Sequence, residues 1–373
     1  MYSPARHIGH IFRKTRPIHL TLFLTRRCNA HCPFCFYLRG RLRSTDCPTA
    51  ELTFSEIEKI SHSMGSLLWL AFSGGEIYLR DDLVEISSVF YSNNRPAIML
   101  YPTNGLLPGV IRSKTEQILK FCKKSVIAVK LSVDGLDGAH DALRNTPGSF
   151  EKTMQTYRAL GELVDAYPNF ELGVNTVFCS GNQHAMDDII DYVKELEHIK
   201  THTVSLVRGD LVNGQYKDVD IELYNRAIDR LESDLKSCCS RRYRFRGGRI
   251  KAAQDIVQRR LIHRTYHEQK RLISCYAGKL NLVITECGDV FPCEILTETF
   301  GNVRFVDGDI NKLLSTDKAA GIVRSISDRK CYCTHECYFM TNILFNPALY
   351  PAVAKEYLAL GAPPGDMCWV ANR

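Results

Sequence analysis

Three cysteines on one short segment are the residues of this sequence best suited to chemistry. Cys28, Cys32 and Cys35 have the spacing C-x3-C-x2-C and directly follow an apolar run. Three thiolates on one tight loop can hold three irons of a [4Fe–4S] cube and leave the fourth iron open, as a catalytic metal needs. A zinc site is the alternative, with His31 as the fourth ligand that structural zinc requires.

A second set of cysteines lies in the C-terminal part of the chain. Its members are Cys275, Cys287, Cys293, Cys331, Cys333, Cys337 and Cys368. Clustered thiols in a reducing compartment indicate metal binding rather than disulfides. Two short apolar runs, 280–285 and 290–291, are joined by a Gly-Asp turn and predict a hairpin that positions two ligands. The other cysteines are scattered, and we expect packing thiols at Cys47, Cys122, Cys179, Cys238 and Cys239.

Strand and helix patterns alternate through the first two hundred residues and must position the first loop. Apolar runs rich in Val, Ile, Leu and Phe predict strands at 19–24, 67–72, 97–101, 126–133, 171–178 and 203–207. Helical patterns lie between them at 55–64, 82–91, 114–123, 150–166 and 185–196. Thr53 and Glu56 form an expected capping box for the first helix. Six strand–helix units predict a parallel sheet curved into a partial (β/α)6 TIM-like barrel, with its chemistry at the carboxyl ends of the strands.

The amino-acid pattern changes twice after the alternating strands and helices end. Residues 218–273 are expected to be helical, and the cysteine-rich remainder has short strands and Gly turns, typical of a small α+β domain. We therefore divide the chain into a barrel at 1–215, a helical bridge at 216–273 and a C-terminal domain at 274–373. The chain has no internal repeat.

Charge is concentrated in one segment of the chain. The net charge is +7, and residues 241–271 hold eleven Lys or Arg against two Asp or Glu. An apolar stripe at helical spacing accompanies them at Ile250, Ala253, Ile256, Val257 and Leu261. We interpret the segment as the solvated basic face of a packed helix; the alternative is a docking surface for an acidic peptide or electron carrier. We expect no nucleic acid partner, because no binding motif accompanies the charge.

Two absences bear on location. No run of about 18 uncharged apolar residues predicts a membrane span, and residues 1–17 lack the apolar core of a signal peptide. We expect a cytoplasmic protein. With about seventeen residues before the first strand, we also expect no fused leader-binding module.

The first cysteine loop, with Phe34 before its last cysteine, resembles the signature of the radical S-adenosylmethionine (SAM) superfamily. Further family-like motifs follow in order after successive strands: Gly74-Gly75-Glu76, Thr103-Asn104-Gly105, the segment 131–135 with Ser132 and Asp134, then Arg144 and Asn175. The resemblance implies that Gly74, Gly75 and Glu76 hold the amino group of the SAM methionine. It implies contacts to the SAM ribose and carboxylate from Asn104, Ser132, Asp134, Arg144 and Asn175. A surface arginine is the alternative for Arg144, and a strand-end hydrogen bond for Asn175.

The C-terminal cysteines resemble the auxiliary-cluster domain of the SPASM and twitch subfamilies. This resemblance implies at least one further [4Fe–4S] cluster, and the spacing favours one. We expect its ligands to be Cys275, Cys293, Cys333 and Cys337, with Cys331 as the competitor for a late position. Cys287 precedes the hairpin glycine, where this family has no usual ligand, and Cys368 stays undecided. Structural zinc on the same four residues is the alternative.

The resemblance implies reductive cleavage of SAM to a 5′-deoxyadenosyl radical that abstracts hydrogen from a substrate. We expect a maturase-like enzyme that modifies a peptide; the alternatives are radical oxidation of a small molecule and a non-catalytic iron–sulfur or zinc protein. Implied partners are a flavodoxin- or ferredoxin-type electron donor and a separate leader-peptide-binding protein. No catalytic acid or base is assigned.

Overall fold

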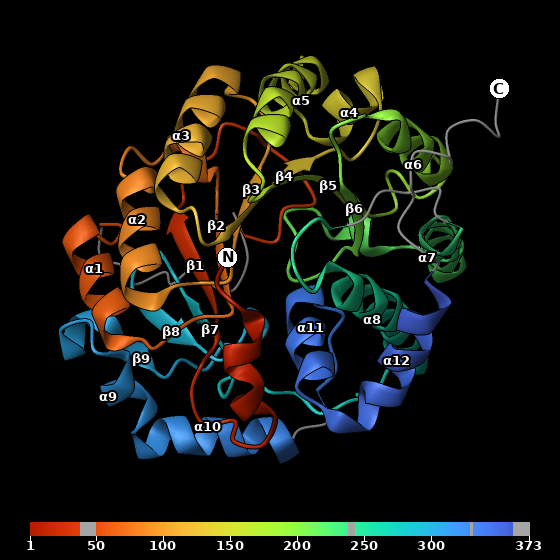
Figure 1. Ribbon diagram of the computed structural model, residues 1–373. Helices are drawn as coiled ribbons and strands as arrows, with labels where there is room; N and C mark the ends of the chain where they lie inside the picture. Colours follow the sequence, from red (N-terminus) through yellow and green to blue (C-terminus); the bar gives the residue numbers. More distant parts are fainter. Residues whose placement is uncertain (38–49, 238–242, 329–330, 361–373) are drawn as a thin grey trace.

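The computed structural model describes residues 1–37, 50–237, 243–328 and 331–360 (Figure 1). Cys47, Cys238, Cys239 and Cys368 lie outside these ranges, so the expectations for them stay expectations. Six parallel strands form the first part of the sheet, each pairing with the next along the chain. They are β1 His19–Thr25, β2 Trp69–Gly74, β3 Ile98–Thr103, β4 Val126–Ser132, β5 Phe170–Phe178 and β6 Thr201–Leu206. The partial barrel predicted from the apolar runs is confirmed.

Helices cover the outer face of this curved sheet. Figure 1 shows them as an outer arc around the strands. They are α1 Phe54–Ser63, α2 Leu83–Asn94, α3 Pro108–Phe121, α4 Asp137–Leu143, α5 Ser149–Ala166 and α6 Met186–Glu195. The capping box at the start of α1 is confirmed, with Thr53 Oγ1 accepting from Glu56 N and the Glu56 carboxylate accepting from Thr53 N. The short α4 was not predicted, because its 7 residues, of which only His140 and Leu143 are buried, are too few to show a periodic pattern.

The C-terminal strands extend the same sheet. β7 (Asn281–Ile284) pairs in parallel with β1, and β8 (Asp289–Phe291) pairs with β7 as the expected antiparallel hairpin. β9 (Gly301–Asn302) follows, so the strand order is β6-β5-β4-β3-β2-β1-β7-β8-β9. This continuation was not expected. It covers the backbone edge that β1 would otherwise leave unpaired.

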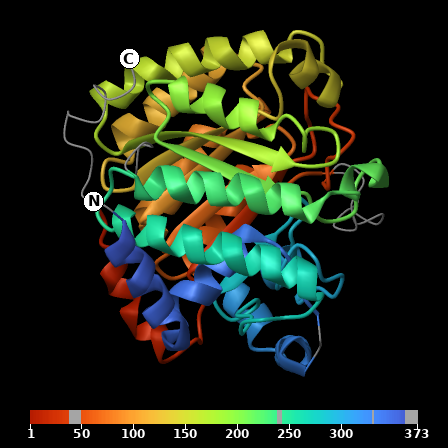
Figure 2. The ribbon, with the colours of Figure 1, turned by 90° about the vertical axis from the view of Figure 1, so that its right-hand side faces the viewer.

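Two antiparallel helices lie beside the open edge of the sheet at β6. They are α7 (Ile221–Lys236) and α8 (Gly248–Glu268), and Figures 1 and 2 show α8 next to α11 (Glu336–Leu344) and α12 (Tyr350–Ala359). The remaining helices are α9 Ile310–Leu314 and α10 Asp317–Asp328. None of the helices within the described ranges is long and apolar enough to cross a membrane.

The basic segment at 241–271 contains α8, and much of this helix is buried. Its apolar stripe packs inward as predicted, except that Ile250 is 49% exposed. Polar side chains also point inward, since Gln254, Asp255 and Gln258 are buried. The helix is packed, as interpreted, and its basic side chains range from 12% exposed at Lys251 to 43% at Arg260 and 59% at Arg264.

Candidate functional site

The first cysteine loop directly follows β1 at the carboxyl end of the sheet. Cys28, Cys32 and Cys35 are free thiols, each partly buried, and Cys35 N donates to Cys32 O at 3.1 Å to close a turn. Burial raises the pKa of Cys28, and it raises the pKa of Cys32 to about 11, while the positive charge of Arg144 acts in the opposite direction. The neighbouring thiols also raise the pKa of Cys32. A bound cation would offset this cost of placing three negative charges together.

Glu76 is a buried carboxylate beside this loop. It accepts hydrogen bonds from Asn104 N at 2.8 Å, Thr103 Oγ1 at 3.0 Å and Tyr78 N at 3.2 Å. Asn104 connects it to the cysteine loop, because Asn104 Nδ2 lies 3.8 Å from Cys28 Sγ and 2.7 Å from Asn29 Oδ1. Burial raises the pKa of Glu76, and these hydrogen bonds act against that shift. The structure thus brings the second and third predicted motifs together with the first.

The two glycines before Glu76 allow the strand to approach the loop closely. A Cβ on Gly75 would lie 2.1 Å from Arg27 O, and one on Gly74 would lie 2.5 Å from Thr25 O. Gly74 also has a φ of +121°, which side-chain-bearing residues rarely adopt. Any larger residue would push β2 away from the segment that leads into Cys28.

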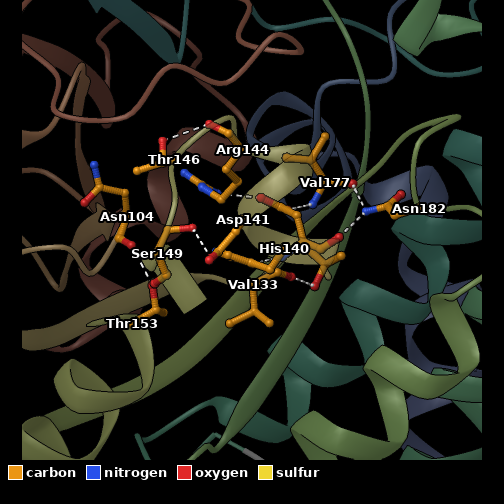
Figure 3. A network of polar contacts seen from close by, with 12 residues as sticks. Asn104, Val133, His140, Asp141, Arg144, Thr146, Ser149, Thr153, Val177 and Asn182 are labelled. Carbon is orange, nitrogen blue, oxygen red and sulfur yellow. Dashed lines mark hydrogen bonds and ion pairs between the residues drawn. The ribbon is translucent and has the colours of Figure 1, made fainter. Parts of the chain in front are cut away.

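The segment after β4 forms a polar network around Asp134, and Figure 3 labels its members Arg144, His140, Val177 and Asn182. Arg144 is ion-paired to the Asp134 carboxylate, and Val177 N donates to the same carboxylate at 2.7 Å. Asn182 Nδ2 donates to Asp134 O at 2.9 Å, and Asp134 N donates to His140 Nδ1 at 3.2 Å. Arg144 is only 8% exposed, so the alternative of a surface arginine is wrong.

Ser132 is the last residue of β4 and pairs in register with Asn175, which lies three residues before the end of β5. Asn175 Oδ1 accepts from Ser205 Oγ of β6 at 2.9 Å. Thr176 lies on the opposite face and donates to Val133 O at 2.6 Å. The structure therefore places Ser132 and Asn175 side by side, and the Asn175 side chain bonds across to β6 rather than to a strand end.

A separate pocket lies among the C-terminal cysteines. It has a volume of about 60 Å³, and its lining includes Cys275, Cys293, Cys331 and Cys333. Apolar side chains such as Ile295 and Phe339 make up much of its wall. Burial raises the pKa of Cys293 and of Cys333, each to about 12. The structure thus brings together three of the four expected ligands and Cys331.

Cys337 faces a different environment. It is absent from the lining of the pocket, and the charged groups that act on its pKa are Glu294, Arg208, Glu336 and Lys251. Burial is the largest influence and raises the pKa of Cys337 to about 12. Cys287 lies outside the pocket as well, with Arg26 Nη2 2.9 Å from its sulfur.

Arg208 links the barrel to the C-terminal cysteines and was not predicted. It follows β6, its guanidinium lies 5.2 Å from the centre of the Phe36 ring, and its Nη1 lies 3.4 Å from Glu336 Oε2. Glu294 lies 3.8 Å away and accepts from His335 Nε2 at 2.6 Å. The position of Arg208 just after the carboxyl end of β6 is the one feature of the sequence that could have identified it.

The donor sets suit a cluster with several irons. Thiolates are the ligands that iron–sulfur clusters use, and each group here places its thiols on loops at a sheet edge or around an apolar pocket. Within the described ranges, no three His, Cys, Asp or Glu side chains are arranged to hold a single metal ion. A four-iron cube is larger than one ion, so its ligands stand further apart than those of a single metal.

Comparison with known proteins finds a matching family model and several similar proteins. A family model described as the Radical SAM superfamily matches residues 22–166. The AdoMet-dependent heme synthase of Methanosarcina barkeri is 27% identical over 291 residues, which cover 75% of this chain and 78% of that protein. The antilisterial bacteriocin subtilosin biosynthesis protein AlbA of Bacillus subtilis is 25% identical over 294 residues, which cover 77% of this chain and 57% of AlbA.

Solved structures share the fold. The enzyme anSMEcpe with bound AdoMet has a TM-score of 0.58 and 19% identity, with coverage of 92% of this chain and 97% of that chain. SuiB of Streptococcus suis bound to S-adenosylmethionine has a TM-score of 0.58 and 15% identity, with coverage of 86% and 69%. The likeness to these structures shows a shared fold, and the matched family model identifies residues 22–166 as a Radical SAM domain.

Proposed function

We propose that this chain cleaves SAM reductively at the Cys28–Cys35 loop and uses the resulting radical to abstract hydrogen from an organic substrate. The Radical SAM domain matched at residues 22–166 implies a [4Fe–4S] cluster and SAM. When bound, these groups supply a 5′-deoxyadenosyl radical by one-electron cleavage of the sulfonium. The observation that carries the proposal is the link from buried Glu76 through Asn104 to Cys28, which joins three separate motifs.

The chain's own residues would bind and orient SAM. Cys28, Cys32 and Cys35 would hold the cluster, and the Glu76 carboxylate would accept from the SAM amino group. Arg144 would face the SAM carboxylate, with its charge balanced by Asp134. Ser132 and Asn175, which pair in register on β4 and β5, would contact the ribose. Gly74 and Gly75 would keep the backbone close enough for these contacts.

We propose one auxiliary [4Fe–4S] cluster in the C-terminal pocket. Its ligands would be Cys275, Cys293, Cys333 and Cys331, because these four thiols line one pocket. Cys337, which the sequence favoured, is replaced in this proposal on the basis of its position beside Arg208 and Glu294. The division into a barrel at 1–215, a bridge at 216–273 and an auxiliary domain at 274–373 remains part of this proposal.

Peptide modification is the first candidate reaction. The names of relatives support it: AlbA is a bacteriocin biosynthesis protein, SkfB of Bacillus subtilis is a sporulation killing factor maturation protein, and one SuiB structure is bound to precursor peptide SuiA. A separate leader-binding protein and a flavodoxin- or ferredoxin-type donor would be its partners. A small-molecule substrate is the second candidate, because the chain spans 78% and 74% of two heme synthases.

The test begins with the anaerobically reconstituted full chain, dithionite and SAM. Formation of 5′-deoxyadenosine is the expected result. Candidate precursor peptides and tetrapyrroles are then added separately, and the substrate class is the one that accelerates 5′-deoxyadenosine formation and changes mass. A fully loaded, reducible protein that forms no 5′-deoxyadenosine with either class would overturn the proposal.

A further inference from the structure

Glu286 is a buried acid just after β7, and its two carboxylate oxygens contact both flanks of the cysteine loop. Its side chain is 1% exposed. Oε1 is ion-paired to Arg26 Nε, and Oε2 accepts a hydrogen bond from Tyr37 Oη. Arg26 precedes Cys28 and Tyr37 follows Cys35, so all three cysteines of the loop lie between the two residues that Glu286 contacts.

The two partners satisfy this acid in different ways. A carboxylate buried away from water is costly unless it is paired and hydrogen-bonded, and Glu286 has one charged donor and one neutral donor. Tyr37 is buried and packs against Phe23 with 4.8 Å between ring centres, whereas the Arg26 side chain is 34% exposed. A second acid, Glu51, accepts from the backbone N of Arg26 at 2.8 Å. The Arg26 guanidinium thus pairs with Glu286, and its backbone with Glu51.

Other anchors of the cysteine loop come from the barrel. Asn213 N, after β6, donates to Pro33 O at 2.8 Å. Val212 N donates to Cys35 O at 3.2 Å. Glu286 differs from these anchors because it follows β7, which the C-terminal part of the chain adds to the sheet beside β1. It therefore connects the cysteine loop to the part of the chain that carries the second set of cysteines.

We propose that Glu286 is a positioning residue for the cluster that cleaves SAM, because it holds Arg26 and Tyr37 and so fixes the path of the cysteine loop. The inference rests on the proposed function and makes that function depend on a residue of the C-terminal part of the chain. Glu286 also balances the charge of Arg26, so the pair presents no net charge to the loop. The reduction potential of an iron–sulfur cluster depends on such nearby charges.

The reduction potential separates this role from a merely structural one. Glu286→Gln keeps the shape of the side chain and leaves the Arg26 charge unbalanced, so it should raise the potential, since a positive charge favours the reduced cluster. Glu286→Gln combined with Arg26→Met carries neither charge and should return the potential to near the wild-type value. The measurement is a redox titration of the reconstituted full chain by electron paramagnetic resonance, using the signal that is absent from Cys32→Ser.

Hydrogen exchange of the chain before reconstitution tests the hold on the loop without any cluster. Glu286→Gln and Tyr37→Phe should each speed amide exchange at residues 27–36 by about threefold to tenfold, because each weakens a buried hydrogen bond. Formation of 5′-deoxyadenosine by reconstituted Glu286→Gln should fall about tenfold. Glu356→Gln is the matched control, since Glu356 is also buried and lies 2.7 Å from Arg260, on α12 instead of at the loop.

The control should leave the potential and the exchange of residues 27–36 as in the wild type. An unchanged potential in Glu286→Gln, an equally raised potential in the double variant, or loop exchange no faster than in Glu356→Gln would overturn the inference. Failure of the proposed function is a separate result. A wild-type chain that holds a reducible cluster but never forms 5′-deoxyadenosine contradicts SAM cleavage, while the potential and the exchange still decide the role of Glu286.

Discussion

Arg144 and Asp134 form a buried ion pair at the carboxyl end of β4, with exposed fractions of 8% and 1%. The pair lies beside the cysteine loop, because Arg144 acts on the pKa of both Cys28 and Cys32. A charge at the candidate SAM site is thereby balanced by an acid from the same chain segment.

Removing one partner of this pair should be costly. Arg144→Met leaves the Asp134 carboxylate buried without its counter-charge, which costs about 3–5 kcal/mol of unfolding free energy. Asp134→Asn combined with Arg144→Met should be less destabilised than the sum of the single changes, since neither charge then remains. Urea unfolding of the four proteins measures this coupling. Strictly additive losses would show that the two side chains do not stabilise each other.

His140 predicts a dependence of stability on pH. Burial lowers its pKa to about 4, so the unfolded chain, with an ordinary value near 6.5, binds the proton more readily. Its contribution is complete above pH 6.5 and is lost as pH falls toward 4, by about 3 kcal/mol in total. His140→Gln should remove this part of the pH dependence, because glutamine can accept from Asp134 N without titrating.

The measurement is the free energy of unfolding at pH 7.5 and pH 5.0 for both proteins. His7, His19 and His202 also have lowered pKa values, so the difference between wild type and variant is the relevant quantity. Identical pH slopes for the two proteins would contradict the assignment to His140.

Gly75 should tolerate no side chain. Gly75→Ala would place a methyl group against Arg27 O, and relief of this clash should cost about 1–3 kcal/mol and displace the cysteine loop. Gly109, near the start of α3, has no atom within 4 Å of an added Cβ, so Gly109→Ala should be neutral or stabilise by up to about 1 kcal/mol. The thermal unfolding midpoint and SAM binding are measured for both variants. Equal behaviour would show that the close approach at Gly75 has no consequence.

The iron content of cysteine variants shows which thiols are ligands of the auxiliary cluster. Cys331→Ser should lose or destabilise the cluster in the C-terminal pocket, lowering reconstituted iron from about eight toward about four per chain. Cys337→Ser should keep about eight, because Cys337 does not line the pocket. Iron and sulfide assays with electron paramagnetic resonance decide between them. Loss of iron in Cys337→Ser alone would restore the ligand set expected from the spacing.

Local patterns predicted most of the barrel, and non-local pairing explains what they missed. Runs such as 126–133 and 171–178 are apolar because both faces of a parallel sheet are covered, which makes them visible in the sequence. The pairing of β7 with β1 joins segments more than two hundred residues apart, and no short pattern encodes it.

For the candidate site, too, local patterns predicted some residues and contacts distant in sequence explain the others. Cys28, Cys32 and Cys35 share one loop, so spacing alone grouped them. Cys331 and Cys337 both lie close to Cys333 in the sequence, so spacing does not decide between them. The fold does, because Cys331 lines the pocket and Cys337, on α11, does not. Arg208 was missed because its partners Phe36 and Glu336 are distant in sequence.

The central claim is that the Cys28–Cys35 loop holds the group that cleaves SAM. The most direct measurement is 5′-deoxyadenosine formation by the reconstituted chain with dithionite and SAM, comparing wild type, Cys32→Ser and Cys122→Ser. Cys122 is a buried free thiol at the C-terminal end of α3 and serves as the matched control. We predict product from wild type and Cys122→Ser and none from Cys32→Ser. Undiminished 5′-deoxyadenosine formation by Cys32→Ser would contradict the claim that this loop holds the group that cleaves SAM.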